Sequence, residues 1–155
     1  MKAIVGVVRW LISVLFLLRR RMGVRHRTCF FSRQASRLSP DFALLQQQLR
    51  KADPTMDIVT ICCRYRGRQD GLLRFLRQCV RSVFLAASAQ VCVLDGYWPT
   101  ICLLRDKRDL RVIQIWHSVG KIKKSGYQTL DKPSGRSGAM ARALCMHRNY
   151  DAIIA

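Results

Sequence analysis

The residue in this chain best placed for proton-transfer chemistry is His117. It directly follows the apolar run 112–116, which is long enough for a buried strand and too short for a helix. In an open parallel sheet the ligand lies just beyond the carboxyl ends of the strands, so substrate can reach a histidine there. Imidazole titrates near neutral pH and can take a proton from a hydroxyl group. His117 is therefore a candidate general base, although a surface or capping histidine fits the same spacing.

A loop rich in glycine and lysine follows this histidine. Glycine lets the backbone approach a phosphate closely, and lysine supplies positive charge. A base beside an anion-binding loop is the arrangement needed for group transfer on a phosphate-bearing substrate. A lysine cluster that is simply solvated is the alternative interpretation. The residues of the candidate loop are Gly120, Lys121, Lys123, Lys124 and Gly126.

The elements that must position these residues alternate between strand and helix. Ser39 followed by Pro40 is typical of a helix start, and the Asp-Pro pair at 53–54 ends the pattern that follows. Residues 72–84 repeat apolar side chains at helical spacing, and 136–146 also indicates a helix. Strands are predicted at 28–32, 58–63, 91–94, 112–116 and 151–155. This alternation predicts an α/β, Rossmann-like parallel sheet with helices on both faces.

Asp95 stands at the end of the third predicted strand. A carboxylate there could orient the imidazole of His117, as an acid often does for a catalytic base. A helix cap or a hydrogen bond within the loop is the simpler explanation for an acid at this position. Both interpretations fit the sequence.

Net charge is the compositional outlier of this chain. Lys and Arg number 28 against 9 acids, all of them aspartate, which gives a formal charge of +19. This balance favours association with polyanions such as nucleic acid, an anionic membrane surface or a phosphate-rich substrate. We find no zinc-finger spacing, no aromatic RNA-binding strand and no recognisable helix-turn-helix, so we expect no specific nucleic acid as partner. A basic membrane- or nucleic-acid-binding fragment without catalytic function is the alternative to an enzyme.

The seven cysteines include no C-x-x-C pair, and several lie inside apolar runs. Free cysteine in that setting behaves as a small apolar residue. We therefore expect reduced, mostly buried thiols, no metal site and a cytosolic folding compartment.

Residues 1–24 form a basic, apolar segment that we expect to associate with a membrane, ahead of a domain at 25–155. The apolar run 3–18 is shorter than the roughly 20 residues that a spanning helix needs, and Arg9 interrupts it. A helix lying in the membrane interface fits better, with Trp10 inserted among the lipids. A tilted single span and a buried core helix are the alternatives. The residues expected at anionic headgroups are Arg9, Arg19, Arg20 and Arg21.

Six groups of motifs occur in the order typical of one known family. They are FSRQ at 31–34 with LSPDF at 38–42, LDGY at 94–97, VIQIWH at 112–117, KKSGY at 123–127, GRS at 135–137 and MHRNYD at 146–151. With these motifs the chain resembles the amino-terminal part of the CDP-glycerol glycerophosphotransferase family of teichoic acid backbone synthesis. The resemblance extends from about residue 25 to the end of the chain.

The resemblance implies a two-domain GT-B transferase, with the acceptor bound mainly by the first domain and CDP-glycerol mainly by the second. Such enzymes transfer glycerol phosphate from CDP-glycerol to a terminal hydroxyl of a polyol-phosphate polymer or lipid-linked acceptor, release CMP and need no cofactor. They act at the cytoplasmic face of the membrane as peripheral proteins. By position in the shared motifs, His117 matches the histidine proposed as general base. Lys123, Lys124 and Gly126 match the Lys-Lys-x-Gly that follows it.

The chain also departs from the family pattern. Ser118 replaces a smaller residue beside the histidine, while Lys121 and Ser125 replace residues expected to be small and aromatic. The chain ends inside a predicted strand at 151–155 without a donor-binding half, so we expect a truncated protein that is inactive alone. Ribitol phosphate in place of glycerol phosphate, and a single priming transfer in place of polymerisation, fit the same residues.

Overall fold

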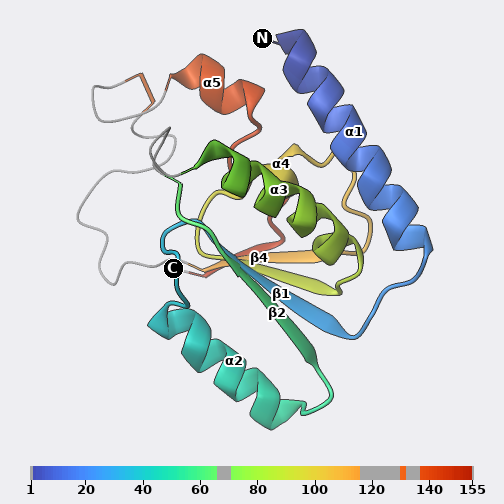
Figure 1. Ribbon diagram of the computed structural model, residues 1–155, viewed down its shortest axis with the longest axis vertical. Coiled ribbons are helices and arrows are strands. Elements are labelled where there is room, and N and C mark those ends of the chain that lie inside the picture. Colours follow the sequence, from blue (N-terminus) through green and yellow to red (C-terminus); the bar gives the residue numbers. More distant parts are fainter. Residues whose placement is uncertain (1, 66–70, 116–129, 132–136, 155) are drawn as a thin grey trace.

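The computed structural model describes residues 2–65, 71–115, 130–131 and 137–154. Within these residues, five strands form one sheet in the order β2-β1-β3-β4-β5, and every neighbouring pair is parallel (Figure 1). The strands are β1 (Arg27–Ser32), β2 (Asp57–Cys62), β3 (Val91–Leu94), β4 (Arg111–Ile115) and β5 (Ala152–Ile154). The predicted Rossmann-like parallel sheet is confirmed.

Helices cover both faces of this sheet, as the alternation of elements predicts. One face carries α2, and the other described helices lie on the opposite face (Figure 1). The helices are α1 (Lys2–Arg21), α2 (Pro40–Ala52), α3 (Leu72–Ala87), α4 (Pro99–Leu103) and α5 (Gly138–Ala143). Right-handed crossovers between parallel strands produce this two-sided arrangement, because the side a helix takes depends on the direction in which the next strand is added.

The helix α2 begins where the sequence predicts. Ser39 is the N-cap, and its Oγ accepts a hydrogen bond from the backbone N–H of Phe42 at 3.3 Å. Pro40 occupies the first turn, where its fixed φ suits the helix and its missing N–H would have no helical partner. The helix ends at Ala52, and the backbone N–H of the C-cap residue Asp53 donates to the carbonyl of Leu49 at 2.8 Å.

The sheet separates two apolar clusters. The larger cluster lies between the sheet and α1, α3 and α4, and it joins Phe31 and Leu94 of the strands to Phe16 and Trp98 of the helical layer. Trp98 is fully buried, and its indole N–H donates to Ser82 Oγ at 2.9 Å, so its polar atom is satisfied. The smaller cluster lies where α2 packs on the opposite face.

All seven cysteines are free thiols, and five of them are buried. Burial raises the pKa of the Cys79 thiol to about 12. Such a thiol stays protonated at neutral pH and packs as a small apolar side chain. The cytosolic folding compartment stays a prediction.

Candidate functional site

The carboxyl ends of three neighbouring strands lie level with one another. Phe31 of β1 pairs with Leu94 of β3, and Leu94 pairs with Gln114 of β4. The loops that follow these strands therefore leave the sheet at the same edge, which we call the carboxyl edge. In open parallel sheets ligands bind at this edge.

Asp95 follows β3 directly and is only 3% exposed. Its Oδ1 accepts a hydrogen bond at 3.4 Å from the backbone N–H of Arg33, the first residue after β1. The carboxylate thus connects the two loops that leave β1 and β3, which is the loop hydrogen bond considered above as the simpler explanation. The role of orienting His117 stays a prediction.

Tyr97, two residues after Asp95, contacts Arg33 and also residues near the end of the chain. The guanidinium carbon of Arg33 lies 5.4 Å from the centre of the Tyr97 ring, within the range of a cation–π contact. The phenol hydroxyl donates to the carbonyl of Leu144 at 3.0 Å, and the ring of His147 lies 6.5 Å away in an edge-on orientation. Residues from the loops after β1 and β3 and from the turn before β5 therefore contact one another around Tyr97.

The turn at 144–149, which places His147 beside Tyr97, has an unusual backbone conformation. Cys145, His147 and Asn149 have φ values of 48°, 61° and 72°. A left-handed backbone costs energy for residues other than glycine, and such conformations concentrate at functional sites. Two hydrogen bonds offset part of that cost, because Asn149 Nδ2 donates to the carbonyls of Ile101 and Leu104 at 2.8 and 2.9 Å.

The structure of this turn shows that one predicted helix ends early, and it brings one further residue to the candidate site. The helix predicted over 136–146 is α5, which ends at Ala143 because the left-handed residues interrupt it. His147 was not predicted as a site residue, and its one signal was its place in the MHRNYD motif at 146–151. Its ring also contacts Tyr150 edge-on, with 6.0 Å between the ring centres. Burial raises the pKa of the Tyr150 hydroxyl, which is therefore a neutral neighbour for the imidazole.

Gln114, near the carboxyl end of β4, is a further polar residue of this region. Its side chain is 2% exposed, and its Oε1 has no hydrogen-bond partner among the described residues. A buried, unpaired carbonyl oxygen costs about 1–3 kcal/mol, so a partner at this position would be stabilising.

The main predicted catalytic segment lies outside the described residues. β4 ends at Ile115, and residues 116–129 are not described. This range holds the candidate base His117 and every residue of the candidate anion-binding loop, namely Gly120, Lys121, Lys123, Lys124 and Gly126. Their roles stay predictions. Among the residues that the structure does describe, no three His, Cys, Asp or Glu side chains come together as metal ligands would.

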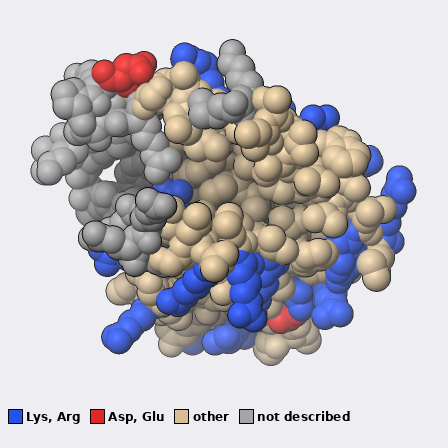
Figure 2. Space-filling model, turned by 45° about the horizontal axis from the view of Figure 1, so that its top comes forward, with Lys and Arg blue, Asp and Glu red and all other residues tan. Residues whose placement is uncertain are grey.

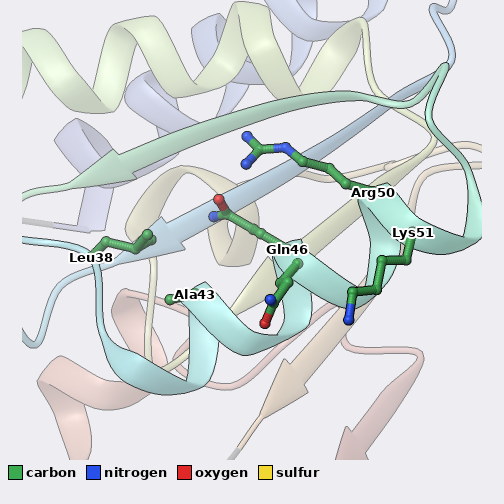
Figure 3. Close-up of a pocket in the computed structure, with 6 residues that line it drawn as sticks. Leu38, Ala43, Gln46, Arg50 and Lys51 are labelled. Carbon is green, nitrogen blue, oxygen red and sulfur yellow. The ribbon is translucent and has the colours of Figure 1, made fainter.

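Two clefts lie among the described helices, one on each side of the sheet. The first has a volume of about 390 Å³ and lies beside α2 (Figure 3). Gln46, which lines it, is buried and donates from Nε2 to Thr60 Oγ1 at 2.8 Å. The lining residues of this cleft are Leu38, Ala43, Gln46, Gln47, Arg50 and Lys51. The second has a volume of about 410 Å³, lies between α1 and α5, and includes Arg9 and Arg142. Both are basic, in keeping with the excess of Lys and Arg over acids on the face shown in Figure 2.

A comparison with known families decides the relationship of this chain. The model of the CDP-glycerol:poly(glycerophosphate) glycerophosphotransferase family matches residues 14–155. The chain belongs to this family. The resemblance drawn from the six motif groups is therefore confirmed.

Three relatives are similar to this member of the family. A teichoic acid ribitol-phosphate primase of Bacillus spizizenii is 29% identical over 139 residues, which are 87% of this chain and 35% of that protein. A teichoic acid poly(ribitol-phosphate) polymerase of the same species is 31% identical over 68 residues, 44% of this chain and 10% of the polymerase. A teichoic acid glycerol-phosphate primase of Bacillus subtilis is 24% identical over 72 residues, 46% of this chain and 19% of the primase. The chain thus spans about a third of the length of the first of these relatives.

The family match begins inside α1, which packs against α3 and α4 as part of the domain. Phe16 of this helix is fully buried in the larger core cluster. Ser13 Oγ donates to the carbonyl of Arg9 at 2.7 Å and accepts from the backbone N–H of Arg105 at 3.0 Å. One face of α1 is therefore a core face, a possibility that the sequence left as an alternative.

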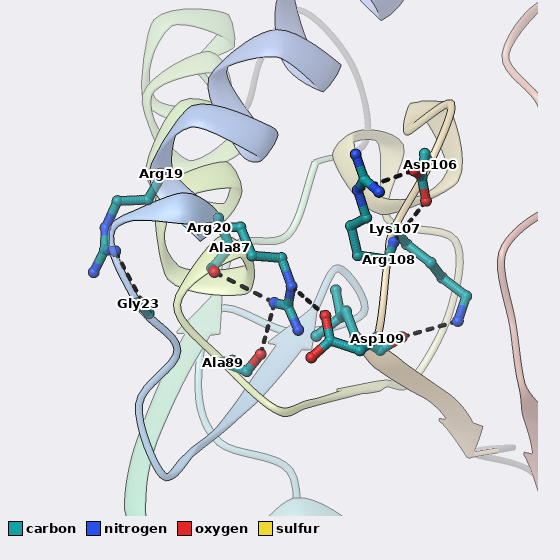
Figure 4. Close-up of polar contacts among 10 residues, drawn as sticks. Arg19, Arg20, Gly23, Ala87, Ala89, Asp106, Lys107, Arg108 and Asp109 are labelled. Atoms are coloured by element: carbon teal, nitrogen blue, oxygen red, sulfur yellow. Dashed lines mark hydrogen bonds and ion pairs between the residues drawn. The ribbon is translucent and has the colours of Figure 1, made fainter.

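Two of the four arginines expected at lipid headgroups lie on this inner face. The side chain of Arg20 is 6% exposed, and it donates to Asp109 Oδ1 at 2.7 Å and to the carbonyls of Ala87 and Ala89 at 3.3 and 3.0 Å (Figure 4). Arg9 is partly buried and donates from Nε to the carbonyl of Leu103 at 3.4 Å. The expectation that Arg20 contacts lipid is wrong, because its guanidinium is enclosed by the domain.

The outer face of α1 is apolar and exposed. Residues 4, 11, 15 and 18 recur at intervals of seven, four and three residues, so they share a side of the helix opposite Phe16. The exposed apolar residues of this outer face are Ile4, Val7, Val8, Leu11, Leu15 and Leu18, and the exposed Met22 follows the helix. Trp10 is 52% exposed and Arg21 is exposed, while Arg19 donates to the carbonyl of Gly23 at 3.2 Å. No described helix is both long enough and apolar enough to cross a membrane.

Proposed function

We propose that this chain is the acceptor-side domain of a GT-B polyol-phosphate transferase. In this proposal the enzyme moves glycerol phosphate from CDP-glycerol to a terminal hydroxyl of a teichoic acid-type polymer or lipid-linked acceptor and releases CMP. The observation that carries the proposal is the family match over 14–155 on a parallel sheet. His117 comes two residues after the last residue of β4 in the sequence, and β4 ends at the edge where such sheets bind ligands.

The chemistry is an in-line displacement at phosphorus. The acceptor hydroxyl oxygen attacks the phosphorus that carries glycerol, and the imidazole of His117 takes the hydroxyl proton. The bond from that phosphorus to the bridging oxygen breaks, and CMP leaves with the electron pair. Lys121, Lys123 and Lys124 would offset the charge on the phosphates, while Gly120 and Gly126 would let the backbone approach them.

The test is the release of CMP from CDP-glycerol by a protein in which this chain is joined to a donor-binding half. We expect His117→Ala to reduce turnover by about a hundredfold or more, the usual contribution of a general base. His26→Ala is the matched control, because His26 is an exposed residue at the start of β1 and pairs with Asp53. Turnover that survives His117→Ala, in a protein with unchanged thermal unfolding, would refute the assignment.

Ribitol phosphate is a second candidate for the transferred group. The relative matched over 87% of this chain is a ribitol-phosphate primase. Equal concentrations of CDP-glycerol and CDP-ribitol, offered together with one acceptor, would decide between them by the ratio of the two products. A product with one added unit would indicate priming, and a ladder would indicate polymerisation.

We also propose that the protein is peripheral at the cytoplasmic face of the membrane, with the outer face of α1 lying in the lipid interface. The support is the six exposed apolar residues of that face together with the net charge of +19, which suits anionic lipids. Leu11→Asp and Leu15→Asp should each weaken binding to anionic vesicles by about tenfold or more, because each replaces an apolar side chain that inserts into the lipid. Leu44→Asp on α2 is the control, since Leu44 is 60% exposed on the other side of the sheet. Equal losses in all three variants would contradict this orientation.

A further inference from the structure

The cleft between α1 and α5 combines two guanidinium groups with a small, apolar lining. Its volume is about 410 Å³, and its lining residues are Val5, Gly6, Arg9, Ala139, Arg142 and Ala143. Three of these are glycine or alanine, so the space between the helices stays open. A Cβ added at Gly6 would meet nothing within 4 Å. The cleft therefore has room for a ligand beside the arginine side chains.

Both arginines have capacity to bind an anion. Arg142 is exposed and forms no ion pair within the described part of the chain. Arg9 uses Nε for the carbonyl of Leu103, and no described partner occupies its two terminal nitrogens. The six lining residues include no acid. Asp131 lies beside Gly138, as Arg142 does, but it forms no ion pair with Arg142. Its Oδ1 accepts from the backbone N–H of Gly138 at 2.8 Å and so caps the start of α5.

This pair of guanidinium groups suits a phosphate or diphosphate. Guanidinium donates two parallel N–H bonds to such oxyanions, and a phosphate held between two arginines is recognised by geometry as well as charge. An inorganic anion would need no apolar wall. The cleft has one, because Val5 and the two alanines line it beside the guanidinium groups.

The position of the cleft indicates an amphiphilic ligand. Viewed down the axis of α1, Val5 lies between Val8 of the outer apolar face and Arg9 of the cleft. The apolar surface of α1 therefore continues into the cleft. A ligand with its phosphate at the arginines could lay an apolar chain along the outer face of α1.

We infer that the α1–α5 cleft binds the phosphate or diphosphate group of a lipid-linked ligand. This inference rests on the proposed function for its biological ligand, which would be the lipid-linked acceptor, but binding can be measured without donor or transfer. The site holds the acceptor at the membrane surface by its anchor phosphate, on the face of the sheet that carries α1 and α5.

The test is calorimetric titration of the 155-residue chain with farnesyl diphosphate, inorganic pyrophosphate and farnesol. Farnesyl diphosphate should bind most tightly, since it alone offers both the diphosphate and an apolar chain. Arg142→Gln should weaken its binding by about tenfold or more, because a charge-assisted bidentate contact is lost. Gly6→Leu should weaken binding as much without changing charge, because the new side chain fills the cleft and leucine suits a helix better than glycine.

Arg50→Gln is the matched control, because Arg50 lines the other basic cleft beside α2. It should change binding less than about twofold. Equal losses in Arg50→Gln and Arg142→Gln would show general charge attraction and overturn the site, as would wild-type binding by Gly6→Leu with an unchanged melting temperature. Pyrophosphate binding as tight as farnesyl diphosphate binding would overturn the lipid ligand. An inactive transferase that still binds farnesyl diphosphate would count against the proposed function and not against this cleft.

Discussion

Replacing Arg20 by methionine should destabilise the domain strongly, although the residue lies in a segment that the sequence assigns to the membrane. Methionine keeps the apolar stem and removes the guanidinium, which lies 5.6 Å from the centre of the Phe16 ring. The variant leaves the carbonyls of Ala87 and Ala89 without their donor, at the carboxyl end of α3 where helix carbonyls lack partners of their own.

The magnitude follows from these contacts. Hydrogen bonds to a charged group contribute about 1.5–3 kcal/mol each, so the two carbonyl bonds suggest about 3–6 kcal/mol. Arg20 Nη2 is buried without a partner among the described residues, so part of the desolvation cost of the guanidinium is never recovered. We therefore expect a loss near the lower bound, about 3 kcal/mol, which corresponds to a fall in melting temperature of about 6–12 °C for a domain of this size.

Two further variants separate the carbonyl bonds from the ion pair. The side chain of Asp109 is 75% exposed, so Asp109→Asn should cost at most about 1 kcal/mol, the range of a surface ion pair. Arg21→Met is the neighbouring control on an exposed position and should stay within about 0.5 kcal/mol of the wild type. Urea denaturation followed by circular dichroism measures all three. Equal losses in Asp109→Asn and Arg20→Met would contradict the role of the carbonyl bonds, and so would an Arg20→Met variant as stable as Arg21→Met.

Three other changes test local features of the fold. Ser39→Ala should cost about 1 kcal/mol in urea denaturation through loss of the α2 N-cap, and Ser39→Asp should restore it. The Asp53 carboxylate raises the pKa of His26 above 6.5, and Thr55 followed by His26 lowers the pKa of Asp53 to about 2. The His26 contribution to stability is therefore complete below pH 6.5 and is lost as pH rises through the raised pKa, while the Asp53 contribution is lost as pH falls from 3.8 through about 2. Asp53→Asn should lower the pKa of His26 in an NMR titration, and an unchanged pKa would contradict the pairing. Asn149→Ala should lower the melting temperature more than Asn149→Gly, because both lose the side-chain hydrogen bonds but glycine accepts the φ of 72°.

Local patterns predicted most of the secondary structure correctly. The strand and helix starts depend on residues that are neighbours in the sequence, as at Ser39 and Pro40, and the five strands lie within a residue or two of their predicted bounds. The helix α4 was not predicted, because its five residues are too few to show a helical period and four of them are buried by the surrounding domain.

The direction of the α1 arginines could be predicted in part. Residues 9, 16 and 20 lie on one side of a helix by simple spacing, opposite residues 4, 11, 15 and 18. Which side faces the domain could not be predicted. The carbonyls that accept from Arg20 belong to Ala87 and Ala89, far away in the sequence, and only folding brings them to the helix.

The sequence by itself determined the α/β class, the parallel direction of the strands and membership of the family. Periodicity, caps and motifs are local properties of the chain, and they suffice for these conclusions. The tertiary structure decided which charges face inwards and which loops meet. Asp95 joins Arg33, Tyr97 reaches Leu144, and Arg9 lies across a cleft from Arg142. These contacts depend on strand order and helix packing, which bring together residues that no local pattern connects.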